Sequence, residues 1–355
     1  MLSLDFTKGG PEITAALEKR LQEQADDPVA LTHLAAIYET QGLREKAAEL
    51  YEQVLRLNSS NPKSLINLAR LYADHLNNQP KALELAKSAY KLAPNDVDIA
   101  HVLGRLVFAN GQYKWALSLL QQGDARKSAD ADLLYNLALA LYSMGQPAEA
   151  VGTMHDALMS NPNFAQAQEA NQFMELVSLA DDPAKAAESE SLIQKTLKTD
   201  AANVPALMAS AAIAQQKGNL PAAISALEQA LQRYPDFTPA IKKLAANYFS
   251  TPGKEQRAYE LAVKAREASP ADAGIARLLG MISYQRGDFS SAVRLLKQGL
   301  ANENPADARP YYYLGMAQFK LKSLSESKTS LQQAMSKNLE GPLADEARKT
   351  LALIK

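Results

Sequence analysis

Residues 131–163 read ADLLYNLALALYSMGQPAEAVGTMHDALMSNPN. Apolar residues recur in this stretch at i, i+3, i+4 and i+7, which is the period of an amphipathic helix. Gly145 separates two such helical patterns, and glycine permits the positive φ that ends a helix tightly. Pro162 blocks continuation of the second pattern. The stretch therefore predicts two helices joined by a short turn.

The same pattern recurs along the chain with a period of about 34 residues. Residues 204–237 match it equally well, and further units with small departures begin near residues 28, 62, 97, 237, 273 and 308. The eighth residue of a unit is small, which lets the two helices of the unit approach closely. These small residues are Ala35, Ala69, Gly104, Ala138, Ala211, Ala245, Gly280 and Gly315.

Tandem units with large, small, turn and proline residues at these positions resemble tetratricopeptide (TPR) repeats. The resemblance covers nearly the whole chain. It implies an all-α fold in which helices A and B of each repeat pack antiparallel, and the repeats stack into a right-handed superhelix, an α-α solenoid.

We expect five parts along the chain, because one unit departs from the pattern and each end shows a lone helix. In order they are a capping helix, repeats 1–4, a degenerate repeat 5, repeats 6–9 and a second capping helix, at residues 11–27, 28–163, 164–203, 204–341 and 342–355. Repeat 5 lacks the turn glycine and carries Ser189 and Thr196 where alanine is usual. Its DDP turn at residues 181–183 still indicates a helix end and a helix start. We expect a joint here, with a bend or a change of pitch.

The two halves of the array match at a constant shift of 176 residues, which relates Gly104 to Gly280 and Tyr72 to Tyr248. An additional turn residue in the unit that begins at residue 62 also recurs in the unit that begins at residue 237. We interpret the match as a block of five repeats that is present twice. Coincidence within a shared consensus is the alternative.

Composition narrows the functional classes. The formal net charge is -1, so there is no basic excess of the kind that nucleic-acid binders carry, and we expect no nucleic-acid partner. The chain has no cysteine, which excludes disulfides, thiol nucleophiles and cysteine zinc sites. No apolar run reaches the roughly 20 residues of a membrane helix, so we expect no membrane insertion.

Targeting signals leave the compartment open. The first residues, MLSLDFTKGG, lack the basic and apolar regions of a secretory signal. A cytoplasmic location is compatible with this, and so is a periplasmic one if the sequence is a fragment of a longer chain.

No pattern points to catalysis. The histidines lie in four different units and show no H-E-x-x-H spacing. They are His33, His75, His101 and His155. Phosphate-binding loops and nucleophile elbows are also missing from the sequence. We therefore expect no catalytic residue, no metal site and no cofactor.

The TPR resemblance implies a partner groove on the concave face, which helix A builds with its second, fifth, ninth, twelfth and thirteenth positions. Read together with Asn136, these positions place in the first half Arg70, Asp98, His101, Arg105, Phe108, Tyr135, Asn136 and Tyr142. In the second half they place Lys242, Phe249, Arg277, Met281, Tyr284, Tyr312, Met316 and Phe319. Aromatic and arginine side chains are the usual anchors of protein interfaces. Packing of a ring against the next repeat is the alternative for each aromatic.

A chaperone-type carboxylate clamp is the one specific ligand site that the resemblance allows us to test. Such clamps use an asparagine together with lysines and an arginine from three repeats. Asn67 and Asn136 occupy the asparagine position, but only His101 and Arg105 could complete half of a clamp with Asn136. We therefore do not expect this site.

The function that we predict is a non-enzymatic scaffold that binds a peptide or protein segment in the groove. Units such as NGQYKWALSLL are similar to bacterial TPR arrays, and residues 311–335 are similar to large exported TPR proteins of polysaccharide export systems. That similarity suggests a bacterial envelope or export assembly. A regulator or sensor module that responds to a ligand or peptide is the second hypothesis. The sequence leaves the oligomeric state and the partner's identity open.

Overall fold

The fold was taken from a computed structural model, which describes residues 10–123, 129–182, 185 and 188–354. All of its regular elements within these ranges are helices, as predicted. In the first half they are α1 (Pro11–Glu23), α2 (Pro28–Thr40), α3 (Arg44–Leu57), α4 (Pro62–Asp74), α5 (Gln79–Leu92), α6 (Val97–Ala109), α7 (Tyr113–Leu120), α8 (Ala131–Ser143) and α9 (Pro147–Ser160). They continue with α10 (Ala167–Leu179), α12 (Glu190–Thr199), α13 (Val204–Gln216), α14 (Leu220–Arg233), α15 (Thr238–Phe249), α16 (Glu255–Ala268), α17 (Ala273–Gln285), α18 (Phe289–Leu300), α19 (Arg309–Lys320), α20 (Leu324–Ser336) and α21 (Gly341–Leu353).

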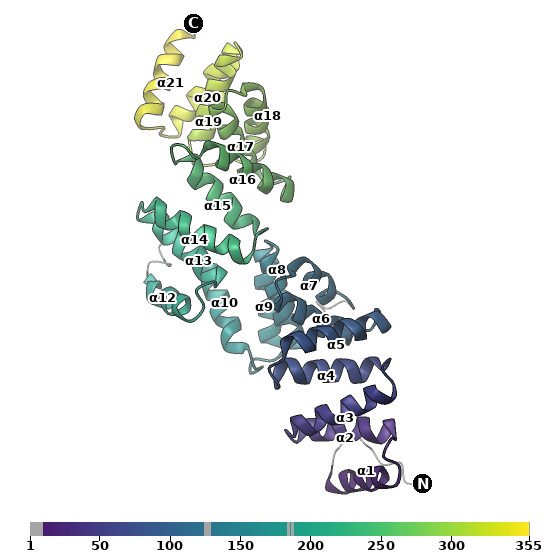
Figure 1. Cartoon of the computed structure of the whole chain (residues 1–355). Coiled ribbons are helices and arrows are strands. Elements are labelled where there is room, and N and C mark those ends of the chain that lie inside the picture. The colour runs from purple at the N-terminus through teal and green to yellow at the C-terminus, as the bar shows by residue number, and fades with distance from the viewer. Residues whose placement is uncertain (1–9, 124–128, 183–184, 186–187, 355) are drawn as a thin grey trace. The chain divides into compact units, whose positions relative to one another are not determined.

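The chain forms two compact units, residues 1–170 and residues 171–355, and the boundary between them falls inside α10. Within each unit, consecutive helices pair and stack on the next pair (Figure 1). The first helix of a pair, such as α4, is called an A helix here, and the second, such as α5, a B helix. The division into nine repeats with a joint at residues 164–203 stays a prediction, as does the handedness of the superhelix.

Several A helices begin at side-chain caps, whereas α15 and α19 have none. Asp27, Asn61 and Asp130 each precede the first turn, and each accepts hydrogen bonds from backbone N–H groups of that turn. Asp27, for example, accepts from Val29 at 2.9 Å and from Ala30 at 3.1 Å. Such caps satisfy donors that a helix start leaves without a partner, so they fix where each repeat begins.

Helices A and B approach each other closely at the eighth position of the repeat, as the sequence predicts. A Cβ atom added to Gly280 would lie 2.7 Å from Cγ of Leu296 and 3.1 Å from its backbone nitrogen. Gly315 stands in the same relation to Leu331, whose Cγ atom would lie 2.6 Å from an added Cβ. Where the eighth residue is alanine, as at Ala138 and Ala211, it is completely buried.

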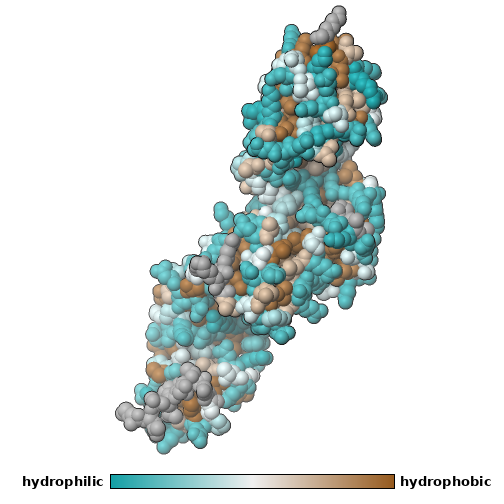
Figure 2. Space-filling view, turned by 180° about the vertical axis from the view of Figure 1, so that it is seen from behind, coloured by the Kyte–Doolittle hydropathy of each residue, from teal (hydrophilic) through white to brown (hydrophobic). Residues whose placement is uncertain are grey.

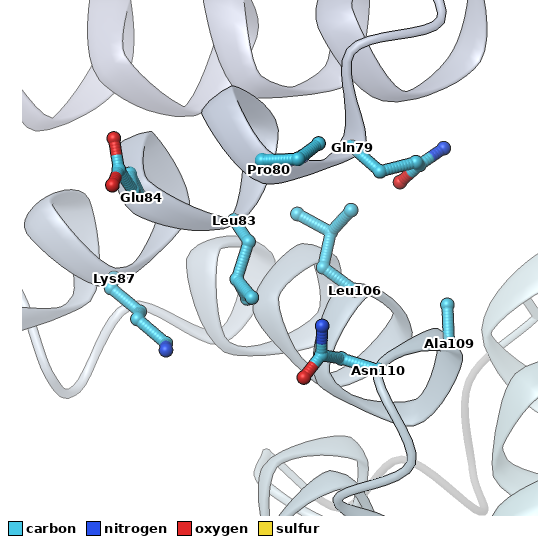
Figure 3. A pocket seen from close by; sticks show the side chains of 8 residues that line it. All are labelled: Gln79, Pro80, Leu83, Glu84, Lys87, Leu106, Ala109 and Asn110. Atoms are coloured by element: carbon cyan, nitrogen blue, oxygen red, sulfur yellow. The ribbon is translucent and has the colours of Figure 1, made fainter.

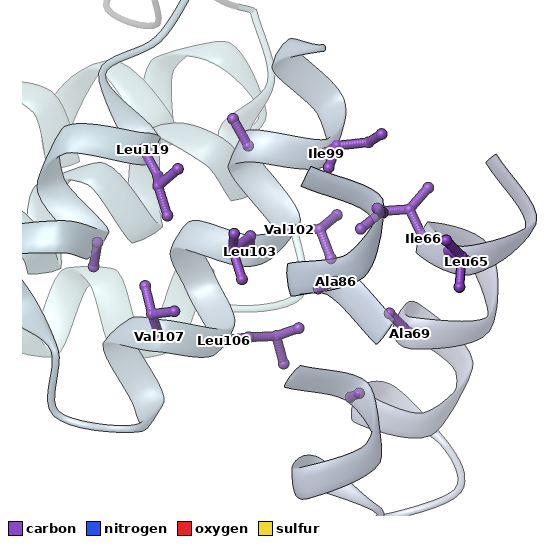
Figure 4. Close-up of a cluster of buried hydrophobic side chains, with 14 residues drawn as sticks. Leu65, Ile66, Ala69, Ala86, Ile99, Val102, Leu103, Leu106, Val107 and Leu119 are labelled. Carbon is purple, nitrogen blue, oxygen red and sulfur yellow. The ribbon is translucent and has the colours of Figure 1, made fainter. Parts of the chain in front are cut away.

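Clusters of buried apolar side chains fill the space between neighbouring helix pairs. One cluster joins α4, α5, α6 and α7, and Leu103 and Leu119 are buried within it (Figure 4). Ala69, Ala82 and Ala86 contribute no exposed surface there, so the backbones can lie close together. Burial of this apolar surface is the main favourable term in the stability of the array.

A tyrosine–glutamate hydrogen bond recurs between neighbouring repeats. The hydroxyl of Tyr38 donates to Glu18 at 2.8 Å, and that of Tyr72 donates to Glu52 at 2.7 Å. Tyr248 donates in the same way to Glu228. The last two pairs are related by the 176-residue shift, so the units that begin near residues 62 and 237 share this contact.

The additional turn residues of the two copies also share a backbone conformation. Asn77 has φ of 48° and Gly253 has φ of 79°, and these residues are again 176 apart. Asparagine and glycine tolerate this left-handed conformation better than other residues do. The additional residue therefore adopts a left-handed backbone conformation in both units.

The degenerate fifth repeat compensates for its polar residues locally. Thr196 is 7% exposed, and its hydroxyl accepts a hydrogen bond from the Gln172 amide at 2.6 Å. The same hydroxyl donates to the Leu192 carbonyl at 2.9 Å. Of the predicted DDP turn, the two aspartates follow the end of α10, whereas Pro183 lies outside the described residues.

The surface is mainly polar. Figure 2 shows hydrophilic and hydrophobic residues interspersed over the visible face. Exposed large apolar side chains in the described residues include Val29, Met159 and Leu353, which lie on three different helices. None of the described helices combines the length and apolar character that crossing a bilayer requires.

We predict that Gly280→Leu destabilises the array, because the new side chain must push apart α17 and α18 at the position of Leu296. Overpacking of this kind costs about 1–3 kcal/mol. The matched control is Gly152→Leu on α9, where an added Cβ meets nothing within 4 Å. Thermal and denaturant unfolding of both variants checks this. An unchanged midpoint for Gly280→Leu would contradict the close approach.

We predict that Asp27→Ala destabilises the N-terminal repeat by about 1–2 kcal/mol at neutral pH, because α2 loses its cap. The backbone N–H of Ala30, followed by the side chain of Arg20, holds the pKa of Asp27 below its usual value. Its contribution is therefore complete above about pH 4 and is lost as the pH falls through the lowered pKa.

Denaturant unfolding from pH 7 down to about pH 3 should show the difference between wild type and Asp27→Ala shrinking at the acid end. Asp26→Ala, at the exposed neighbouring position, is the control and should show little effect. A difference that is independent of pH would rule out the ionised cap.

Candidate functional site

The A helices lie next to one another within each unit. In the first unit α4 contacts α6 and α6 contacts α8, and in the second α15 contacts α17 and α17 contacts α19. Side chains at equivalent positions of successive A helices therefore gather on one surface, which is called the A-helix face below.

An open cleft of about 750 Å³ lies on the A-helix face of the first unit. It is bounded by α4, α6, α8 and the segment that precedes α10. The residues that the sequence predicted and that the structure brings together in this cleft are Arg70, His101, Arg105, Tyr135 and Asn136. Asp98, which was read from the same positions, also lines it.

Further polar residues of the cleft were missed at the sequence level. They are Asp74, His75, Asp130, Asp132 and Gln166. The rule that selected Asp98 at the second position also points to Asp132, and the thirteenth position points to Asp74. His75 and His101 belong to different repeats in the sequence, yet the fold places both at this cleft. Gln166 precedes α10, where no repeat position predicts it.

The arginines of the cleft are partly neutralised by the protein itself. Arg105 donates to both oxygens of Asp74, at 2.6 Å and 3.0 Å, in a bidentate pair that joins α6 to α4. Arg70 lies close enough to Glu39 of α2 to influence its ionisation, although burial is the larger effect and raises the pKa of Glu39. The bidentate pair holds the guanidinium group of Arg105 in place.

The polar groups around Tyr135 are positioned by α8. The Tyr135 ring packs edge-on against Phe164, with ring centroids 5.8 Å apart, and its burial raises the pKa of the phenol. Asn136 donates from its amide nitrogen to the Asp132 carbonyl at 2.6 Å, which fixes the orientation of its side chain. Tyr135 thus offers the cleft a half-buried ring with a polar end.

His101 is held by its own repeat. Its Nε2 atom lies 3.2 Å from the Gln122 carbonyl oxygen at the end of the paired B helix. Arg277 makes the equivalent contact in the second unit, where it donates to the Gly299 carbonyl at 2.6 Å and to Glu303 at 2.5 Å. Residues 101 and 277 therefore share a structural role. Each contacts a backbone carbonyl near the C-terminal end of the B helix of its own repeat.

Two predicted site residues of the first unit lie outside the cleft. Phe108 is half-buried and packs against Tyr113, with ring centroids 5.2 Å apart. Tyr142 is only 2% exposed. Burial leaves Tyr142 no surface to offer a partner, so the alternative of core packing holds for this ring.

In the second unit the predicted residues form an aromatic cluster and ion pairs. Phe249 and Tyr284 each pack edge-on against Tyr313, at centroid distances of 5.9 Å and 5.3 Å. Tyr313 was not predicted, because it occupies the sixth position of its repeat. Lys242 pairs with Asp272 at 2.8 Å, and Phe319 remains partly exposed.

Tyr312 is structural in this conformation. It is 2% exposed, and its hydroxyl donates to Glu346 of α21 at 2.7 Å. The residue therefore joins the last repeat to the C-terminal helix instead of facing a groove. Met281 and Met316 are likewise buried, at 7% and 3% exposure.

A second, smaller pocket of about 360 Å³ lies between α5 and the end of α6 (Figure 3). Leu83 and Leu106 form its apolar floor, and Asn110 lies at its edge. At the equivalent place in the second unit, Arg286 stacks on Tyr259 at 4.3 Å from the ring centroid. No predicted site residue lines this pocket, so we do not assign it to the groove.

The polar groups of the cleft can form contacts with a bound chain. Among the described residues, no group of three or more histidine, cysteine, aspartate or glutamate side chains is arranged to hold a metal ion. The cleft offers carboxylates, an amide, imidazoles and a phenol, which can form hydrogen bonds and ion pairs with a bound chain.

Tetratricopeptide repeat models match residues 32–97 and 278–335, residues 108–171 and residues 206–236, and together they cover more than half of the chain. The chain belongs to the tetratricopeptide repeat family. TPR proteins are a family of protein–protein interaction scaffolds. No curated protein matches the sequence significantly.

Solved structures agree with a TPR fold. The crystal structure of the APC/C hetero-tetramer Cut9-Hcn1 matches with a TM-score of 0.52 at 15% identity, over 96% of this chain and 86% of that chain. This likeness shows the fold alone. The TPR domain of P58(IPK) reaches a TM-score of 0.36 at 15% identity, over 88% of this chain and 94% of that chain.

YrrB, described as a TPR protein with an unusual peptide-binding site, reaches a TM-score of 0.33 at 23% identity. The match covers 55% of this chain and 97% of that chain. Likeness at these lower scores carries no argument about the site of this TPR array.

We predict that Tyr312→Phe loosens α21 by about 1 kcal/mol, because the buried phenol loses its hydrogen bond to Glu346. Hydrogen exchange of the α21 amides should accelerate, while exchange in α15 should stay unchanged. A double-mutant cycle with Glu346→Ala isolates the pair. Unchanged exchange in α21 would contradict the structural role of Tyr312.

Proposed function

We propose that the protein is a non-enzymatic scaffold whose A-helix face binds a segment of a partner protein, and that the cleft of the first unit holds that segment. One observation carries the proposal. Five groove residues that were chosen by repeat position alone converge on a single open cleft. Core packing of those side chains would instead have distributed them over separate interfaces between repeats.

The size and the lining of the cleft suit a peptide. Its volume of about 750 Å³ lies within the range of roughly 300–1,000 Å³ that is usual for binding sites. Tyr135 provides a rigid ring that orders few torsions on binding. The fixed amide of Asn136 and the imidazole of His101 provide hydrogen-bonding groups beside it. A backbone segment can therefore find partners along the cleft.

The open form of the cleft favours a scaffold over the second hypothesis, a ligand-responsive regulator. A sensor for a small molecule would need an enclosed pocket that buries most of its ligand. A role in a bacterial envelope or export assembly is a further part of our proposal, and it rests only on the wording of the repeat units.

Panning of a displayed random-peptide library on the purified full chain tests the proposal. We expect enriched peptides, and we expect Tyr135→Ala to weaken their binding about tenfold or more, because truncated anchor residues at interfaces cost more than 1 kcal/mol. Titration of labelled peptides by fluorescence anisotropy measures this.

Tyr259→Ala is the matched control, since it removes the same ring from a B helix of the second unit and should leave binding unchanged. Circular dichroism confirms that both variants are folded. Failure to enrich any peptide, or equal affinities of wild type and Tyr135→Ala for those enriched, would overturn the proposal.

A further inference from the structure

Among the described residues that line it, the cleft of the first unit has four aspartates and two arginines. Asp74 and Arg105 neutralise each other in their bidentate pair, and Arg70 acts electrostatically on Glu39. The carboxylates of Asp98 and Asp132 add further negative charge, Asp130 lies beside them, and Glu169 is near Tyr135. His75 and His101 also face the cleft.

The excess of carboxylates affects the ionisation of Asp132. Partial burial and then the nearby carboxylate of Asp130 raise the pKa of Asp132, and Arg105 compensates only in part. Asp130 itself is occupied as the cap of α8, where it accepts from the N–H groups of Asp132 and Leu133. A bound cation at this end of the cleft would offset the repulsion between the two carboxylates.

A second and independent observation favours a ligand that carries a hydrogen-bond donor. The side-chain oxygen Oε1 of Gln166 is buried at the cleft, and no donor within the described part of the chain reaches it. A buried acceptor without a donor is unfavourable, so a ligand that supplies an N–H group gains from filling this position. A cationic group that donates hydrogen bonds would match both this acceptor and the carboxylates of Asp98 and Asp132.

The carboxylates of Asp98 and Asp132 have no acidic counterparts at the matching positions of the second unit. The 176-residue shift relates Asp98 to Gly274, and the shift of 177 that relates Tyr135 to Tyr312 relates Asp132 to Arg309. In the second unit, Arg309 donates to Asp307 at 2.8 Å, so that carboxylate is paired. Asp132 and Arg309 thus carry opposite charges at equivalent places, whereas Asp98 corresponds to an uncharged glycine.

We infer that the cleft of the first unit selects a cationic segment of a partner protein, one that inserts arginine or lysine side chains between Asp98, Asp132 and Gln166. This inference rests on the proposed function and specifies its partner. Arginine fits best, because its planar guanidinium donates to several acceptors at once and can also stack on the Tyr135 ring.

A partner that presents a carboxylate is the competing occupant, and the geometry opposes it. The guanidinium of Arg105 already donates two hydrogen bonds to the carboxylate of Asp74. An incoming carboxylate would have to displace Asp74 and approach the remaining aspartates. Like charges brought together in this way disfavour a complex and slow its formation.

Three labelled peptides of equal length test the inference; they share one tyrosine and differ only in carrying arginine, glutamine or glutamate at the same positions. We expect the full chain to bind the arginine peptide at least about tenfold more tightly than the other two, with an affinity that falls as salt is raised. Equal binding of the glutamine or glutamate peptide would overturn the inference.

Charge-removing variants locate the effect. Asp98→Asn with Asp132→Asn should abolish the preference for arginine, whereas Asp26→Asn with Asp156→Asn changes the net charge equally at exposed positions outside the cleft and should keep it. Gln166→Leu should weaken binding of the arginine peptide several-fold without loss of helix content. Retention of the preference in the cleft double variant would contradict the proposed site.

The two proposals can fail separately. If library peptides bind through Tyr135 but show no enrichment of basic residues, the peptide cleft stands and the charge inference falls. If neither the library nor the arginine peptide yields Tyr135-dependent binding, the proposed function itself falls.

Discussion

The close approach of helices A and B at the eighth position is the contact on which the rest of the structure depends. A glycine or alanine there, as at Gly280, lets a leucine of the partner helix enter, and the backbones draw together. Apolar burial then becomes continuous from one pair to the next, because no side chain holds the helices apart. Each repeat contacts mainly its sequence neighbours, so the stability of such arrays comes from local interfaces that add along the chain.

That packing also decides which side chains are free to bind. Successive A helices touch, so their fifth and ninth positions meet on one surface, and five predicted residues reach one cleft. Aromatic rings at equivalent positions can still have different surroundings. Tyr135 lines the cleft of the first unit, whereas its counterpart Tyr312 is covered by α21 and bonded to Glu346. The element that follows a repeat therefore determines whether its aromatic side chain lines an open cleft or is buried in the core.

The internal match separates residues that pack the repeats from residues that vary between them. The tyrosine–glutamate contact and the inserted turn recur at the same shift, since they serve the packing between repeats. On the A-helix face, by contrast, Asp98 and Asp132 correspond to Gly274 and Arg309. The charge at these positions therefore differs although the surrounding helices pair in the same order.

The sequence by itself determined the all-α repeat fold, the positions of the turns and the close contact at Gly104, Gly280 and Gly315. These features follow from local periodicity and side-chain size, which a single unit already displays. Only the tertiary structure decided that Tyr142 and Tyr312 are buried, that Arg105 is bound to Asp74, and that His75, Gln166 and four aspartates share a cleft. Those outcomes depend on contacts between different repeats, and neither burial nor ion pairing across repeats is encoded in the position of a residue within its own unit.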